Sequence, residues 1–265
     1  MHSACGRSAF GINRDDFKLQ RLASTAEIIR TFEPQKEIRA GHFKLSAGAD
    51  GLLVDVGDFG VHSHALRQRG TICGPVSKYG SKQALLADLK AELPAAKRPD
   101  AIIIGALGRV GTGAADLCTA MDVAVTKWDM AETASGGPFP EILQHEIFLN
   151  CILARPGCPV FVPESAKKAE RALTVIGDIA CDPTSDFSPI KVYDRATDWE
   201  LPALRVWDSP PLDVMAIDNL PSLLPVESSE DYAKQLLPSL LTLTDLGAGV
   251  WGRAFTEFTR HTATL

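Results

Sequence analysis

The chain has 265 residues, of which 45% are hydrophobic and 23% charged, which is ordinary for a soluble globular protein of one or two domains. Its net charge is −6 and its basic residues are dispersed, so electrostatics favour neither nucleic acid nor an anionic membrane as a partner. No apolar run approaches the ~20 residues of a membrane-spanning helix. The first residues lack a basic start followed by an apolar core, so we expect no signal peptide and a cytoplasmic protein.

The six cysteines are scattered without a Cys-x-x-Cys pair, and the six histidines form no metal-ligand cluster. We therefore predict reduced thiols and no metal site. The cysteines are Cys5, Cys73, Cys118, Cys151, Cys158 and Cys181.

Residues 1–69 show weak local patterns interrupted by glycines. Residues 24–32 are consistent with a helix, and residues 51–56 with a strand. We interpret His62 and His64 as parts of a surface loop rather than a ligand pair. This segment is expected to be an atypical N-terminal part of a second domain, either a remnant of a substrate domain or disordered.

A strand, a glycine-rich turn and a helix follow in succession. Residues 77–93 predict an amphipathic helix with Ser81 as N-cap, ended by Pro94. The unbroken apolar run 101–104 then predicts a strand buried on both faces, and residues 115–121 have helical spacing.

The turn departs from the Gly-x-Gly-x-x-Gly dinucleotide fingerprint. The fingerprint positions fall on Ala106, Gly108 and Gly111, so an alanine replaces the first glycine, while Gly105 and Gly113 flank the motif. The motif alone leaves open whether the turn is purely structural or binds a pyrophosphate at the helix N-terminus.

An acid at the end of the next strand favours the nucleotide interpretation. Residues 123–129 predict a short strand, and Asp129 follows Gly111 by 18 positions. The fingerprint expects an acid about 20 residues on, where its carboxylate binds the ribose hydroxyls. Because a carboxylate repels a 2′-phosphate, we predict NAD rather than NADP. The competing interpretation is a solvated loop aspartate.

Three further strands are predicted at residues 146–153, 172–180 and 214–218. The fold class is therefore α/β, a Rossmann-like doubly wound parallel sheet. Polar residues gather at the predicted strand ends, where such sheets bind ligands, although each acid singly could instead cap a helix or turn. These residues are Asp129, Asn150, Asp178, Asp182 and Asp218.

The remaining chain is predicted to be mostly helical. Residues 130–140 contain too much Gly and Pro for a long helix, whereas residues 227–238 suit a helix capped by Ser228 or Ser229. A last helix at 249–258 carries an aromatic stripe that we expect to pack rather than to recognise a ligand. We predict three parts: residues 1–69, an NAD-binding domain at 70–225, and C-terminal helices at 226–265 that pack on the N-terminal part.

From residue 72 onward the sequence resembles the NAD-dependent, L-lysine-forming saccharopine dehydrogenases. Alanine dehydrogenases and transhydrogenase subunits are more distantly similar. The segments that carry the resemblance occur in the family's order and are residues 103–109, 127–129, 132–133, 136–139, 148–152, 177–182 and 217–225.

The resemblance implies two domains with the ligands in the cleft between them, NAD as cofactor, and saccharopine, or lysine plus 2-oxoglutarate, as small-molecule substrate. Hydride would pass to NAD, and water would hydrolyse the imine. The positions that match the family's motifs are Gly108 and Arg109 at the pyrophosphate, Asp129 at the adenosine ribose, Thr133, Leu153 and Ile179 along the nucleotide, Ala180, Cys181 and Asp182 toward the substrate, and Ile217, Asp218, Asn219 and Leu220 over the nicotinamide half.

The family's lysine and histidine acid/base pair, and its carboxylate-binding arginines, lie in an N-terminal domain that residues 1–69 do not match. We therefore assign no catalytic residue. Three functions stay open: the saccharopine dehydrogenase itself, a non-catalytic or impaired NAD-binding relative, and a related amino-acid dehydrogenase with another substrate. The oligomeric state is not predicted.

Overall fold

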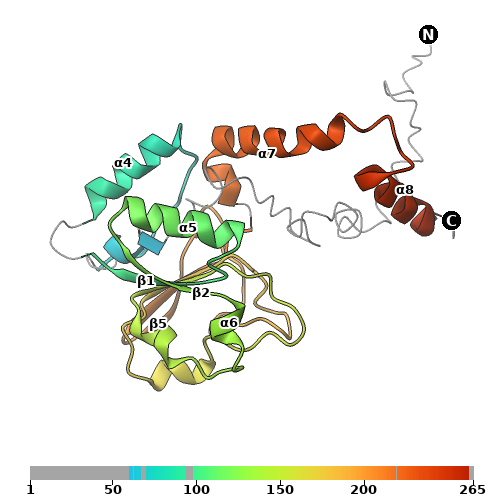
Figure 1. Cartoon of the computed structure of the whole chain (residues 1–265). Coiled ribbons are helices and arrows are strands. Elements are labelled where there is room, and N and C mark those ends of the chain that lie inside the picture. Colours follow the sequence, from blue (N-terminus) through green and yellow to red (C-terminus); the bar gives the residue numbers. More distant parts are fainter. Residues whose placement is uncertain (1–59, 62, 67–69, 94–97, 219, 263–265) are drawn as a thin grey trace, which may run out of the picture. The chain divides into compact units, whose positions relative to one another are not determined.

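The structure is a computed structural model that describes residues 60–61, 63–66, 70–93, 98–218 and 220–262 (Figure 1). The chain divides into two compact units, one spanning Ser46–Ala233 and the other containing Lys234–Leu265. The predicted helix at 24–32, the predicted strand at 51–56 and His62 lie outside the described residues.

A six-stranded sheet forms the centre of the first unit, in the order β2-β1-β3-β4-β6-β5. Five strands are parallel and β5 pairs antiparallel with β6, which confirms the predicted Rossmann-like α/β class. The strands are β1 (Asp100–Ile104), β2 (Ala124–Trp128), β3 (Ile147–Asn150), β4 (Val175–Asp178), β5 (Leu204–Asp208) and β6 (Pro211–Met215).

The chain reverses its direction of travel across the sheet after β2. Helix α5 (Arg109–Ala120) connects β1 to its outer neighbour β2. The chain then returns through α6 (Met130–Thr133) and the 3₁₀ turn η1 (Pro140–Gln144) to β3, on the other side of β1. Ligands of doubly wound sheets bind at the carboxyl ends of the strands beside such a reversal, here between β1 and β3.

Each face of the sheet has its own core. Side chains alternate along a strand, so Ile103 packs on one face with Leu85 and Leu89 of α4 (Lys82–Glu92) and with α5. Ile102 and Phe148 pack on the other face. That face is covered by η1 and η2 (Glu164–Lys168), whereas α4 and α5 cover the first (Figure 1).

The first unit differs from the predictions in three details. Strand β5 is not among the predicted strands, and the last predicted strand begins at residue 214, whereas β6 begins at Pro211. His64 does not lie in a surface loop: residues 63–66 are helical and His64 is buried, with Nε2 3.8 Å from Oε1 of Glu146.

Helix boundaries differ from the predicted ones in both directions. Ser81 caps α4 as predicted, by accepting the amide of Ala84, but the helix begins only at Lys82. Helix α7 (Pro225–Leu240) begins three residues before Ser228 and continues past Pro238. Pro225, at position 1, has the φ of a helix and needs no intrahelical acceptor, whereas Pro238 in the last turn leaves α7 without one i→i−4 hydrogen bond.

Helix α8 (Gly249–Thr262) in the second unit confirms the last predicted helix and extends it. Phe255 and Phe258 are each more than half exposed, so the expectation that the aromatic stripe packs is wrong for these two rings. The Trp251 indole donates a hydrogen bond to the carbonyl of Ser239 at 2.7 Å. Among the helices of the described residues, none combines the length and the apolar character needed to cross a membrane.

Candidate functional site

The site residues predicted from the sequence follow the carboxyl ends of parallel strands. Gly108 and Arg109 follow β1, and Asp129 and Thr133 follow β2, while Leu153 follows β3. Residues 179–182 follow β4, and residues 217–220 follow β6, with Asn219 outside the described residues. Because these strands are parallel neighbours, the fold brings all five groups to one edge of the sheet.

Gly105 makes the tight turn at the end of β1. Its φ is +83°, a conformation that side chains disfavour, and an added Cβ would lie 2.9 Å from the carbonyl oxygen of Cys151. The amides of Gly105 and Ala106 both donate to the carbonyl of Trp128. Gly105 therefore takes the part that the fingerprint gives to its first glycine, one position earlier than the spacing indicates.

Gly111 allows α5 to approach the turn. A Cβ at Gly111 would lie 2.2 Å from the carbonyl oxygen of Gly105, closer than any side chain can come. Gly108 is the N-cap of α5 and supplies no side-chain cap. The first amides of a helix have no intrahelical acceptor, and the helix dipole makes this end positive, so the start of α5 favours an anion.

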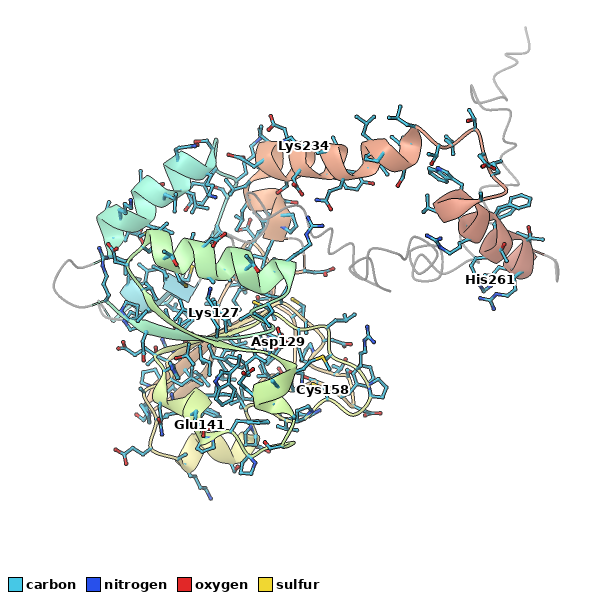
Figure 2. The ribbon with its side chains drawn as sticks, viewed as in Figure 1. Lys127, Asp129, Glu141, Cys158, Lys234 and His261 are labelled. Atoms are coloured by element: carbon cyan, nitrogen blue, oxygen red, sulfur yellow. The ribbon has the colours of Figure 1, made fainter. Side chains whose placement is uncertain are left out.

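Asp129 lies where β2 ends and α6 begins (Figure 2). Its carboxylate accepts the amide of Leu107 at 3.0 Å and the amide of Met130 at 2.9 Å. The side chain of Glu132 in turn accepts the amide of Asp129, which completes a capping box. Asp129 thus caps a helix, and its carboxylate also joins the end of β2 to the glycine turn of β1. Its role at the ribose stays a prediction.

Arg109 is the first residue of α5, and its guanidinium faces another acid. Its Nη2 lies 3.5 Å from Oδ2 of Asp231 in α7, and both side chains are partly buried. The cation predicted at the pyrophosphate is therefore present at the start of α5, and it forms an ion pair with α7.

A buried polar cluster joins the ends of β3 and β4. Asn150 and Asp178 are both fully buried, and the Asn150 amide donates to Asp178 at 2.9 Å. The Tyr193 hydroxyl donates to the other carboxylate oxygen at 2.6 Å, and the amide of Ala180 donates at 2.9 Å. Three donors satisfy this carboxylate, as a buried charge requires.

Burial and the nearby Asp178 carboxylate raise the pKa of Tyr193 above its ordinary value, so the phenol stays a neutral donor. Cys181, two residues beyond Ile179, has φ +48°, which is unusual for a residue other than glycine. Its thiol lies 3.1 Å from the carbonyl oxygen of Asp178 and 3.2 Å from that of Ile217. Cys181, one of the predicted substrate-side residues, is thus held by one carbonyl group at the end of β4 and another that follows β6.

The other predicted residues differ in exposure. Leu153 is 47% exposed and Asp218 is exposed, whereas Ile179 and Leu220 are buried. Leu220 begins the 3₁₀ turn η3 (Leu220–Leu223). Thr133 donates its hydroxyl to the carbonyl of Asp129 at 3.0 Å. Leu153 and Asp218 therefore have side chains open to solvent, whereas those of Ile179 and Leu220 are not.

Sequence reasoning missed two contributors to this edge, Tyr193 and Asp231. Tyr193 lies in an irregular segment between β4 and β5 with no periodic signal, and Asp231 is one of several acids on a solvated helix. The described residues contain no group of three or more His, Cys, Asp or Glu side chains that could hold a metal ion.

Comparison with curated proteins decides the relationship. The chain is 43% identical over 203 residues to the saccharopine dehydrogenase [NAD(+), L-lysine-forming] of Neurospora crassa, covering 72% of this chain and 55% of the relative. The enzyme of the same name from Candida albicans is also 43% identical, with 53% of it covered, and that of Schizosaccharomyces pombe is 44% identical over 164 residues. This chain is related to the L-lysine-forming saccharopine dehydrogenases.

The relationship confirms the resemblance inferred from the motifs. The chain spans about half the length of the saccharopine dehydrogenases that it matches. No family model matches the chain.

Proposed function

We propose that this chain binds NAD at the carboxyl edge of its sheet and that its activity is the oxidative cleavage of saccharopine to L-lysine and 2-oxoglutarate. The observation that carries the proposal is the contact between Asp129 and the amide of Leu107, which joins the acid of β2 to the glycine turn of β1. The names of the relatives support NAD and saccharopine as the ligands.

The adenosine half would lie over the ends of β1 and β2. The amides at the start of α5 and the side chain of Arg109 suit the diphosphate. Asp129 is half-buried beside them and suits the ribose hydroxyls. Leu107 and Met130 are 80% and 83% exposed and flank Asp129, so they offer apolar surface to the adenine ring.

The nicotinamide half would cross the reversal point toward β4 and β6. Residues 180–182 and 217–220 follow these strands, and the cluster of Asn150, Asp178 and Tyr193 fixes the backbone beneath them. NAD, when bound, would accept a hydride from the carbon that bears the secondary amine. The chain's own residues would orient the two ligands, and we assign none of them to proton transfer.

The test of cofactor binding is the substitution Asp129→Asn, measured by calorimetric titration with NAD and with NADP. Loss of the charged acceptor is expected to weaken NAD binding roughly 10- to 100-fold, because hydrogen bonds to charged groups contribute about 1.5–3 kcal/mol. NADP should lose less, since the repulsion of its 2′-phosphate disappears with the charge.

Glu132→Ala is the matched control, because it removes the other half of the same capping box and leaves the Asp129 carboxylate unchanged. If Glu132→Ala weakened NAD binding as much as Asp129→Asn, the role of Asp129 would be capping alone.

The test of activity is NADH absorbance with saccharopine and NAD. Turnover supports the dehydrogenase, whereas NAD binding without turnover supports the non-catalytic alternative. Turnover of other amino acids in a panel, with none for saccharopine, would assign a different substrate. A cytoplasmic location stays a prediction that imaging of the tagged protein tests.

A further inference from the structure

We propose that Asp231 is a positioning residue that holds Arg109 and competes with the diphosphate of a bound dinucleotide for its guanidinium. The inference rests on the proposed NAD binding and goes beyond it, because it assigns to a residue of α7 the effect of lowering the affinity for NAD.

The geometry places the acid at the start of α5. Arg109 follows Gly108, which has no side chain to cap the helix, and its Nη2 lies 3.5 Å from Oδ2 of Asp231. The two side chains are 27% and 21% exposed. The Asp231 carboxylate therefore pairs with the guanidinium that a phosphate bound at the start of α5 would otherwise contact.

Helix α7 is fixed where it carries this acid. Four residues before Asp231, on the same face of α7, Glu227 accepts the amide of Lys82, the first residue of α4, at 2.6 Å. The hydroxyl of Ser228 donates to the carbonyl of Pro221 at 2.9 Å. Glu227 and Asp231, on one face of α7, thus contact the first residues of α4 and α5. These contacts fix the part of α7 that carries Asp231.

Charge decides the direction of the effect. The diphosphate is attracted by Arg109 and by the dipole of α5, and the Asp231 carboxylate neutralises the Arg109 part of this attraction. Dinucleotide binding must therefore either displace Asp231 from Arg109 or share the guanidinium with it. Either way Asp231 lowers affinity, and its charge is what lowers it.

The test is Asp231→Asn, which keeps the shape and removes the charge. NAD affinity by calorimetry at low salt should rise two- to fivefold, in line with a partly exposed ion pair. The gain should shrink as salt is added, because salt screens the attraction of both the carboxylate and the diphosphate to Arg109. Asp231→Ser repeats the test with a shorter side chain.

Glu230→Gln is the matched control, because it removes the neighbouring exposed charge of α7 and should leave affinity unchanged. In an Arg109→Gln background, Asp231→Asn should give clearly less gain than in the wild type, which a general change in net charge would not produce.

Equal or weaker NAD binding by Asp231→Asn, with a wild type that binds NAD, overturns this inference alone. Equal gains with and without Arg109 overturn it too. If no variant and no wild-type protein binds NAD, the proposed function fails and the inference fails with it.

Discussion

The contact between Tyr193 and Asp178 shows how one residue can fix a strand end. Asp178 is fully buried and so cannot exchange its protein partners for water. Its carboxylate accepts from Tyr193, Asn150 and the amide of Ala180, which ties the segment after β4 to the end of β3. The backbone that leads to Cys181 is positioned by this carboxylate.

Tyr193→Phe should destabilise the protein by about 1.5–3 kcal/mol, because it leaves a buried charged acceptor with one donor fewer. The difference in stability between the wild type and Tyr193→Phe should be largest at neutral pH. The pKa of Tyr193 is higher in the native state than the ordinary tyrosine value of about 10, so the neutral phenol stabilises the native state fully only below pH 10. This contribution is lost as the pH rises above 10, because the unfolded phenol ionises first.

Denaturant unfolding between pH 7 and pH 11 measures both effects. Tyr232→Phe on α7, where the ring is 37% exposed, controls for the loss of one phenol. Wild-type stability of Tyr193→Phe at pH 7 would show that the hydrogen bond between Tyr193 and Asp178 does not stabilise the protein.

Gly111→Ala should destabilise the protein by about 3 kcal/mol or more and abolish NAD binding. The new methyl group would meet the backbone of Gly105 and Ala106 at 2.2 and 2.6 Å, so α5 must move away from the turn. Gly74→Ala is the control, because a Cβ there would meet no atom within 4 Å. Thermal unfolding and NAD titration of the two variants test the difference, and equal behaviour contradicts the close approach.

The sequence predicts residues whose role follows from spacing and misses those whose role follows from folding. Asp129 could be found because strand, turn and acid occur at a known interval along the chain. Tyr193 could not, because its partner Asp178 is 15 positions earlier and only the path between β4 and β5 brings them together. Gly105 was noticed, but its positive φ, which assigns its role, is a property of the fold.

At the scale of elements, five of the six strands could be predicted, and the edge strand β5 could not. The apolar runs of β1, β3 and β4 are buried throughout, which is the pattern that sequence reasoning recognises. Strand β5 is only partly buried and contains Arg205 and Asp208, so it has no such run. Its pairing depends on the turn at Ser209 and Pro210 and on side-chain contacts with β6.

One of these contacts is an ion pair between Arg205 and Asp213. Asp213 is 1% exposed, and Arg205 donates to both of its carboxylate oxygens. Bidentate geometry makes this pair strong, and burial makes the carboxylate costly to leave alone.

Arg205→Ala should therefore destabilise the protein by about 3 kcal/mol, because a buried carboxylate loses its cation. Arg195→Ala is the matched control: its pair with Asp194 spans 3.7 Å between side chains that are 69% and 85% exposed, so we expect a change below about 1 kcal/mol. Chemical denaturation measures both. Equal losses for the two arginines would show that burial of Asp213 has no effect on stability.

At the scale of the whole molecule, five separate segments of the chain contribute to one edge of one sheet. This convergence could be predicted once the strands were taken as parallel, because parallel strands end on the same side. The order of the strands could not be predicted from the chain, and it is the order that places the reversal between β1 and β3. All five segments belong to the unit Ser46–Ala233, so the site's affinity and that unit's stability are linked.

This linkage gives a prediction for unfolding. NAD at about 100 times its dissociation constant should stabilise the native protein by about 2.7 kcal/mol. For a unit of this size that corresponds to a rise of roughly 5–10 °C in melting temperature. Scanning fluorimetry with increasing NAD measures the shift, which should grow with the logarithm of the ligand concentration.

NADP at the same concentration should shift the melting temperature less, because the Asp129 carboxylate repels its 2′-phosphate. This difference between NAD and NADP should narrow in Asp129→Asn. Equal shifts from NAD and NADP in the wild type would contradict a ribose-selecting role for Asp129.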